Sequence, residues 1–340
     1  MQLITEYGSP AVLTGYVREA LADRPGNAFS LSRWLPDRTI NDISFQLSRG
    51  GGGLTEAAGY RNWDAESDIA TAPGSSRITG ELPPISRKKP VGEYERIRRR
   101  GVAADQAAEI QNAMLSDGVV LGRQIEARVE IARAQALFEG RVVLQENGLV
   151  GITADYGRNA AHNVTATKVW SDPTADIIAD TSAWLEVYSD TNGDRPTYTL
   201  MSLKIYNWLR RNNQLRALST TGATAPSVLT SSTLDALLAD YGIPQPVIYD
   251  AKYSVAGTAT RVTPEDKICF LPAEGDAVGQ TLWGVPVEGD DPRYGLAGSE
   301  AGIAVGAYKT EDPQTVWTRA TAIVLPVAAD PDRTFVADVL

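Results

Sequence analysis

The most regular pattern along the chain lies between Ala103 and Gly140, where apolar side chains recur at steps of three, four or seven residues. This spacing is typical of one face of an α-helix. The charged residues between them, Glu130 and Arg133 included, are expected on the solvent side. At about 1.5 Å per residue such a helix spans roughly 54 Å, and Gly140 stands where a left-handed cap would end it. The apolar face is formed by Ile110, Met114, Leu121, Ile125, Val129, Ala132 and Ala136.

Two glycines, Gly118 and Gly122, lie within this predicted helix. Each weakens a helix by about 1 kcal/mol relative to alanine, so the sequence allows a bend after Asp117. An ordinary long core helix would show the same periodicity, and the pattern alone leaves both interpretations open.

Before the long helix, the pattern predicts a short helix, an arm and a strand. Ser9-Pro10 joins an N-cap residue to a proline suited to the first helical position, and apolar residues follow at helical spacing up to Leu21. Residues 31–37 are expected to form an extended arm. Apolar and polar residues alternate over residues 43–47, which predicts a strand.

The stretch from residue 54 to residue 90 contains few large aliphatic side chains and much alanine, glycine, serine and proline. A structureless loop of this length inside a compact domain would be unusual. We therefore interpret residues 49–90 as a hairpin-like excursion that another subunit covers. Ile78, Leu82 and Ile85 are expected to form its return strand.

After the long helix, residues 142–144 and 149–152 flank Asn147-Gly148, a dipeptide that favours tight hairpin turns. A third strand at residues 164–170 is expected to join this hairpin. Ser171-Asp172-Pro173 is a second pairing of a cap residue with a proline, and a helix is expected to start there.

The remainder of the chain mixes helices and strands without strict alternation, which predicts an α+β fold. Helices are expected over residues 177–188, from Ser202 to Leu215, and from a cap at Ser231 or Ser232 to Tyr241. The predicted strands are residues 198–201, 247–249, 253–255, 258–262, 267–271, 316–327 and 334–339.

Charge is distributed unevenly along the 340 residues, whose net charge of −10 excludes nucleic-acid binding by bulk attraction. Residues 86–100 hold seven basic side chains against two acidic ones, a net charge of +5. This strip is interpreted either as a solvated helix start or as a surface that meets an acidic neighbour or phosphates. The single cysteine, Cys269, excludes an internal disulfide, and no apolar run approaches the ~18 residues of a membrane span.

Few residues suit catalysis or metal binding, and no cofactor or metal is predicted. His162 is the only histidine, so a zinc site or a serine triad would depend on it, and its polar turn predicts an ordinary surface residue. The glycine run 50–53 fits no phosphate-binding or dinucleotide-binding fingerprint. One acidic cluster leaves a soluble carboxylate-based hydrolase as an alternative. Its members are Glu288, Asp290, Asp291 and Glu300.

The parts of the chain follow one another in a definite order. They are an arm, a glycine-rich turn, a long excursion, a basic strip, one long helix, a hairpin, a mixed block and a β-rich tail. Short local motifs accompany them: Arg49-Gly50-Gly51, Arg98-Arg99-Arg100, Trp170, Asp172-Pro173 and Ala329-Asp330-Pro331-Asp332. In this order of parts and in these motifs, the chain resembles a tailed-bacteriophage major capsid protein of the Hong Kong 97 fold, more closely the lambda-type major head protein family.

The resemblance implies four parts. Residues 1–45 would be an N-terminal arm, and residues 46–90 the E-loop, which lies over a neighbouring subunit. Residues 91–172 and 303–340 would form the P-domain, with the long helix at about 103–140 as its spine. Residues 173–302 would form the A-domain at the centre of a capsomer.

The resemblance also implies where subunits meet. Some relatives crosslink through an E-loop lysine, but here the excursion holds only Lys88 and Lys89, at its base, which speaks against that chemistry. The residues expected at contacts between subunits are Arg49, Gly50, Gly51, Arg87, Lys88, Lys89, Arg98, Arg99 and Arg100.

A non-enzymatic shell protein is the function that the resemblance implies. Copies would assemble as hexamers and pentamers into an icosahedral shell enclosing double-stranded DNA. The expected partners are the chain itself, a separate scaffolding protein, a decoration protein, a portal complex and non-specifically contacted DNA, with no membrane. Assembly would occur in the bacterial host cytoplasm and the protein would reside in the virion. An encapsulin-type nanocompartment with protein cargo shares the fold and is the alternative.

Overall fold

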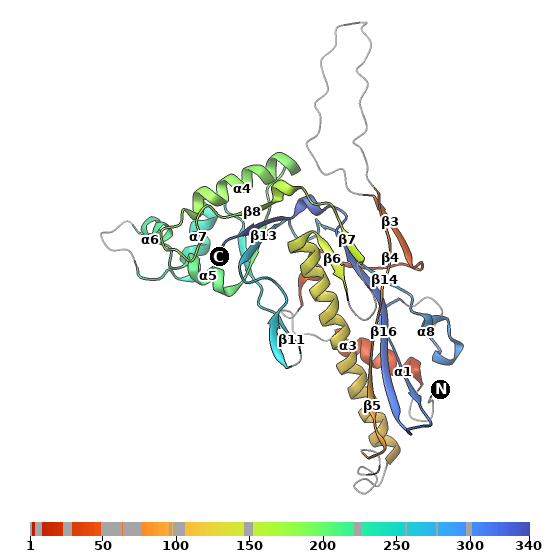
Figure 1. Ribbon diagram of the computed structural model, residues 1–340. Coiled ribbons are helices and arrows are strands. Elements are labelled where there is room, and N and C mark those ends of the chain that lie inside the picture. Colours follow the sequence, from red (N-terminus) through yellow and green to blue (C-terminus); the bar gives the residue numbers. More distant parts are fainter. Residues whose placement is uncertain are drawn as a thin grey trace.

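A computed structural model of the protein shows two sheets, one of six and one of five strands, arranged around a long helix (Figure 1). The five-stranded sheet and its helices lie near the C-terminal end of that helix, and the six-stranded sheet runs alongside it. The structure describes residues 2–3, 9–22, 29–48, 63, 77–94, 97, 106–145, 152–220, 226–255, 257–276, 278–296 and 301–340.

The long helix α3 (Gln106–Glu139) confirms the predicted one, and its 34 residues span about 51 Å. Residues 103–105 lie outside the described part. Along the predicted apolar face, Met114, Leu121 and Val129 are each no more than 2% exposed. Gly140 adopts a left-handed φ of +67° and ends the helix as predicted.

The two glycines of α3 have a packing role, because they face α1 (Pro10–Ala22), a helix that the sequence also predicts. A Cβ atom at Gly118 would lie 3.0 Å from a methyl group of Val17, and one at Gly122 would lie 2.9 Å from Cδ1 of Leu21. Only glycine at both positions leaves room for α1 to approach this closely. α1 also contacts β15 (Ala304–Lys309), where the Thr14 hydroxyl donates to the Val305 carbonyl (3.1 Å).

The six-stranded sheet is centred on β16 (Val316–Val327), whose bounds match the prediction. β5 pairs with no strand other than β16 among the described residues, so the far edge of β5 is open. The other strands of the sheet are β1 (Gln2–Leu3), β2 (Asp37–Thr39), β5 (Pro84–Val91), β14 (Gln280–Gly284) and β15 (Ala304–Lys309).

The five-stranded sheet with its four helices is here named the five-stranded block. Its central strand β13 buries side chains on both faces: Ile268 and Phe270 pack against the helices, whereas Cys269 and Leu271 face α3 and its surroundings. In order, the strands are β10 (Gln245–Ile248), β9 (Tyr198–Met201), β13 (Lys267–Leu271), β17 (Phe335–Asp338) and β8 (Asn163–Thr165). The helices are α4 (Ile177–Asn192), α5 (Leu203–Leu209), α6 (Asn213–Leu218) and α7 (Ser231–Asp240).

Three two-stranded ribbons and several short helices complete the described fold. The ribbons are β3 (Ser44–Ser48) with β4 (Arg77–Glu81), β6 (Arg141–Leu144) with β7 (Ile152–Asp155), and β11 (Lys252–Val255) with β12 (Thr258–Arg261). The short helices are η1 (Leu31–Arg33), η2 (Ala160–His162), α8 (Val287–Asp290), η3 (Pro292–Tyr294) and η4 (Pro331–Arg333). Among the described helices, none combines the length and apolar character needed to cross a bilayer.

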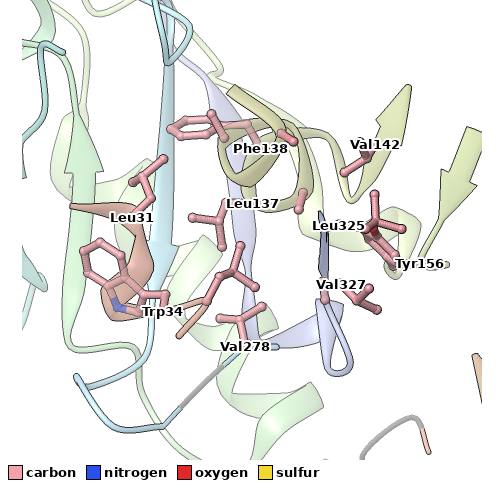
Figure 2. Close-up of a cluster of buried hydrophobic side chains, with 14 of the residues drawn as sticks. Leu31, Trp34, Leu137, Phe138, Val142, Tyr156, Val278, Leu325 and Val327 are labelled. Carbon is pink, nitrogen blue, oxygen red and sulfur yellow. The ribbon is translucent and has the colours of Figure 1, made fainter. Parts of the chain in front are cut away.

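Both sheets and α3 meet in one central cluster of buried side chains (Figure 2). Trp34 lies beside Leu137 of α3 in this view, with Val278 below them and Leu325 of β16 on the far side. Trp34 is 1% exposed, and its indole nitrogen donates to the Pro272 carbonyl at 3.1 Å.

This cluster shows that the extended arm expected over residues 31–37 is wrong. Residues 31–33 form η1, and Leu31, Trp34 and Leu35 are buried against α3 and β14. Three large apolar side chains within five residues bury more favourably in this chain's own core than along an exposed arm.

The placement of Glu130 and Arg133 on the solvent side is also wrong, because both side chains are buried. They lie one helical turn apart, with Arg133 Nη1 3.1 Å from Glu130 Oε2. Burial of charged groups is tolerated when each neutralises the other and their remaining hydrogen bonds are satisfied.

Four further predictions in the five-stranded block need correction. Residues 164–170 do not join the β6–β7 hairpin, because β8 pairs with β17 instead. The helix expected at Ser171 begins at Ile177, where the Asp176 carboxylate accepts from the Ala179 amide at 3.1 Å. The helix expected from Ser202 to Leu215 is broken, and its second part is capped by Asn212. Thr230, not a serine, caps α7.

The predicted division into parts stays a prediction, but the two sheets cross its boundaries. β14, within the predicted A-domain of residues 173–302, pairs with β16. β17, within the predicted P-domain tail, pairs with β13 of the five-stranded block. Strand pairing joins segments far apart in the chain, and a boundary drawn along the sequence cannot represent that.

Candidate intersubunit contact surface

The exposed edge strand β5 carries three consecutive cations, Arg87, Lys88 and Lys89. Because its far edge is unpaired among the described residues, it presents free backbone donors and acceptors there. Charged side chains and a proline, here Pro90, are the usual means by which sheet edges avoid indiscriminate pairing. The edge is therefore open to a partner that complements positive charge.

The two lysines of this strand have partners within the chain. Lys89 Nζ lies 2.5 Å from Asp117 Oδ1 of α3, and Lys88 Nζ lies 4.4 Å from the centre of the Trp317 ring. The Trp317 ring stacks in turn on Tyr308. Arg87 has no ion-pair partner in the described part of the chain, so its charge is available to another molecule.

A groove of about 880 Å³ lies between β5, α3 and β16 and is here named the β5–α3 groove. Its apolar lining includes Ile85, Ile125 and Leu325, and the guanidinium groups of Arg87 and Arg128 are the charged groups among its lining residues. Among the residues that the structure describes, no carboxylate lines it. An occupant with apolar side chains and a carboxylate would complement this surface. The remaining lining residues are Pro83, Pro84, Ser86, Gln124, Val129, Ala132, Leu144, Val324 and Pro326.

Large apolar side chains are exposed on either side of β5 in the sequence. Trp63, the one described residue between positions 49 and 76, is 93% exposed. Tyr94 and Ile97, just after β5, are 79% and 66% exposed. Tryptophan and tyrosine are enriched at protein interfaces, so Trp63 and Tyr94 are candidates for contact with a partner.

Of the residues predicted at subunit contacts, the structure places Arg87, Lys88 and Lys89 together on β5. The other six lie outside the described residues. They are Arg49, Gly50, Gly51, Arg98, Arg99 and Arg100.

His162 is not the surface residue that the sequence predicts, because it is fully buried in the five-stranded block. Its Nδ1 lies 3.2 Å from the Thr334 carbonyl, which can only accept, so Nδ1 carries the hydrogen. Nε2 lies 3.0 Å from the Thr191 hydroxyl. Burial lowers the pKa of His162 below its ordinary value of 6.5. The ring is a structural element of the core.

Two carboxylates of the acidic cluster are engaged in ion pairs. Glu288 pairs with Arg319 at 3.3 Å, and Asp291 with Arg293 at 2.6 Å. The Arg293 hydrogen bonds lower the pKa of Asp291, so this carboxyl is ionised and cannot serve as an acid near neutral pH. Glu300 lies outside the described residues.

Cys269 is fully buried, and burial raises the pKa of its thiol to about 12, which makes it inert. In the part of the chain that the structure describes, no group of three or more histidine, cysteine, aspartate or glutamate side chains is placed to hold a metal ion.

Comparison with known proteins identifies the family of this chain. Residues 31–339 match the model of the family described as phage major capsid protein E. The chain belongs to this family. A comparison with curated protein sequences found no significant match.

Solved structures share the fold of this capsid protein. A protein assigned as the capsid protein of a prophage of E. coli CFT073 has a TM-score of 0.61 and 15% identity, covering 98% of this chain and 99% of that one. A phage-related protein of Bordetella bronchiseptica RB50 has a TM-score of 0.56 and 14% identity, covering 99% and 98%. The mature capsid of bacteriophage PhiM1 gives a TM-score of 0.51 and 12% identity, covering 91% and 86%. The predicted α+β, Hong Kong 97-like fold is confirmed.

This protein is therefore a phage major capsid protein, and the family match favours that reading over an encapsulin. Membership implies a structural role, self-association and a place in the virion.

The sequence did not reveal the β5–α3 groove. Residues 83–87, 124–132 and 324–326 line it, and no local pattern brings three such distant segments together. The basic residues of β5 were the one signal that pointed to it. Residues 325–327 gave no such signal, because they belong to β16, a strand whose side chains are almost all buried.

Proposed function

We propose that copies of this major capsid protein assemble as hexamers and pentamers into an icosahedral shell that encloses double-stranded DNA. The match of residues 31–339 to the capsid family carries the proposal. The exposed side chain of Trp63 supports it, because an aromatic group left 93% exposed in one copy gains contact area when another copy covers it.

We further propose that β5 and the β5–α3 groove take part in contacts between copies. Their charge supports this: β5 holds Arg87, Lys88 and Lys89, whereas the whole chain has a net charge of −10. A second copy therefore offers an acidic surface to a basic one. Arg49-Gly50-Gly51 and Arg98-Arg99-Arg100 are proposed for the same contacts.

The remaining partners follow from the shell. We propose a separate scaffolding protein, a decoration protein and a portal complex, with assembly in the bacterial host cytoplasm. Contact with DNA would be non-specific and limited to local basic surfaces such as residues 86–100, because the net charge of −10 gives the whole chain no bulk attraction for phosphates. The division into N-terminal arm, E-loop, P-domain and A-domain is proposed with the boundaries given above.

Imaging tests the proposal. The full-length chain, expressed with its neighbouring gene products, would be purified, treated with nuclease, sedimented and viewed by negative stain. We expect rings of five and six subunits and closed shells with nuclease-protected double-stranded DNA. A protein that stays monomeric at every salt and protein concentration would contradict the shell, and shells filled with a cargo protein would favour an encapsulin.

A further inference from the structure

Glu130 of α3 connects three chain segments through one buried carboxylate. Its Oε1 accepts the backbone amide of Leu31 at 2.9 Å and the hydroxyl of Tyr249 at 2.7 Å. Its Oε2 accepts from Arg133 at 3.1 Å. Tyr249 belongs to the five-stranded block, since it follows β10 and its amide donates to the Met201 carbonyl. The Tyr249 hydroxyl is therefore a direct polar link between that block and Glu130, which lies in the C-terminal half of α3.

Arg133 extends this connection to the six-stranded sheet. Its Nη2 lies 2.5 Å from Asp37 Oδ1 of β2, and its Nε donates to the Thr281 hydroxyl of β14 at 2.9 Å. The Asp37 carboxylate also accepts from the Trp283 indole at 2.7 Å. Arg133 and Glu130 are thus held on the six-stranded side by several contacts, whereas the five-stranded block reaches them through Tyr249.

A second link joins the block to the end of α3. Arg158 donates to the carbonyls of Leu137 (2.9 Å) and Phe138 (2.8 Å), which the helix itself leaves unpaired. The same guanidinium group donates to the Thr334 hydroxyl next to β17 at 3.2 Å. A cation at a helix C-terminus also complements the helix dipole. This link has three hydrogen bonds and is the stronger of the two.

The two links lie seven residues apart on α3, from Glu130 to Leu137, or about 10 Å along the axis. The block also packs on α3 through the apolar side chains of the central cluster, and such apolar contact is non-directional. The two polar links are directional, and two of them about 10 Å apart fix the angle. Loss of the Tyr249 hydrogen bond leaves Glu130 still paired with Arg133 and the Leu31 amide. No uncompensated buried charge results, so this link can open without the large cost of breaking a buried ion pair.

We propose that the hydrogen bond from Tyr249 to Glu130 is a latch that fixes the angle between the five-stranded block and α3, with the Arg158-capped end of α3 as the pivot. With the latch closed the block has one angle, and with it open the block rotates about the pivot. Its use in the shell rests on the proposed function: hexamers and pentamers place identical chains in unlike surroundings, and an opening latch lets one chain fit both.

The test measures the angle in the unassembled full-length chain, at a concentration where sedimentation shows monomers. Spin labels are attached at Ser116→Cys on α3 and Ser182→Cys on α4, both exposed positions, while the native Cys269 is buried and stays unlabelled. Electron–electron resonance then gives the distribution of distances between the labels. Tyr249→Phe removes only the latching hydroxyl. Tyr206→Phe is the matched control, because its buried hydroxyl donates to Asp235 within the block and touches no part of α3.

We expect Tyr249→Phe to stay folded and to broaden the distance distribution at least twofold, while Tyr206→Phe keeps the parent distribution. An unchanged distribution in Tyr249→Phe would overturn the latch, as would equal broadening in the control. A Tyr249→Phe chain that does not fold would also overturn it, because the hydroxyl would then hold the fold and not merely the angle. Since no shell is needed, a failed latch and a failed shell are separate results.

Discussion

The five-stranded block and the β5 edge of the six-stranded sheet differ in what they leave uncovered. Within the block, the rings of Trp170, Trp184, Phe270 and Phe335 stack on one another between sheet and helices. At the β5 edge, Arg87, Lys88 and Lys89 face solvent, and Arg128 lines the adjoining groove. The aromatic core of the block is closed within this chain, whereas the β5 edge presents the charge of Arg87 and unpaired backbone groups to a partner. Stability and assembly should therefore respond to different residues.

The largest loss of stability is expected in the aromatic stack. Phe335 is fully buried, with its ring centre 5.8 Å from that of Phe270. Phe335→Ala removes the ring and leaves a cavity, which should lower the free energy of unfolding by about 3–5 kcal/mol in urea titrations. A loss below about 1 kcal/mol would show that the side chains of the five-stranded block are not tightly packed.

A smaller loss is expected where α1 meets α3. Gly122→Val puts side-chain atoms where Leu21 and Val17 already lie within 3.0 Å of a Cβ position, so the free energy of unfolding should fall by about 1–3 kcal/mol.

Gly15→Ala on α1 is the matched control for this contact. A Cβ atom there would have no neighbour within 4 Å, so the better helix propensity of alanine should raise stability by up to about 1 kcal/mol. Equal changes in the two variants would contradict a packing role for Gly122.

A further effect on stability depends on pH. Because burial holds the pKa of His162 below 6.5, the unfolded chain takes up a proton there before the folded one does. Stability is fully present above pH 6.5 and falls as the pH drops below it, by up to about 1.4 kcal/mol per pH unit. His162→Gln should remove this slope between pH 7 and 5 in paired urea titrations. A slope that is the same in both proteins would show that other groups produce it.

Local patterns predicted much of the fold. The 3.6-residue period gave α3, and capping residues gave α1 and Ser202 of α5. The strands predicted at residues 198–201 and 316–327 are β9 and β16. These features depend on neighbours in sequence. The predictions failed where distant segments determine the structure. Trp34 is buried against β14 and α3, and β8 pairs with β17, whose residues lie 173 positions later in the chain.

The candidate surface was predictable only in part. The three cations of β5 are visible in any reading of the sequence, but the apolar floor of the groove comes from α3 and β16. Glu130 and Arg133 were misplaced because a charged pair buried by tertiary contacts has the same sequence pattern as a solvated one. The periodicity of charged residues along a helix indicates which side chains are exposed only when no distant segment of the chain packs against them.

The claim that stability and assembly depend on different residues is tested most directly by reversing the charge of Arg87 on β5. Arg87→Glu should change the free energy of unfolding by no more than about 0.5 kcal/mol, as expected for an exposed side chain without an ion-pair partner. Its critical concentration for assembly, measured by sedimentation, should rise at least tenfold, while Arg123→Glu, an equally exposed reversal on α3 outside the groove, assembles like the parent. Normal assembly of Arg87→Glu, or equal impairment of both variants, would contradict the account.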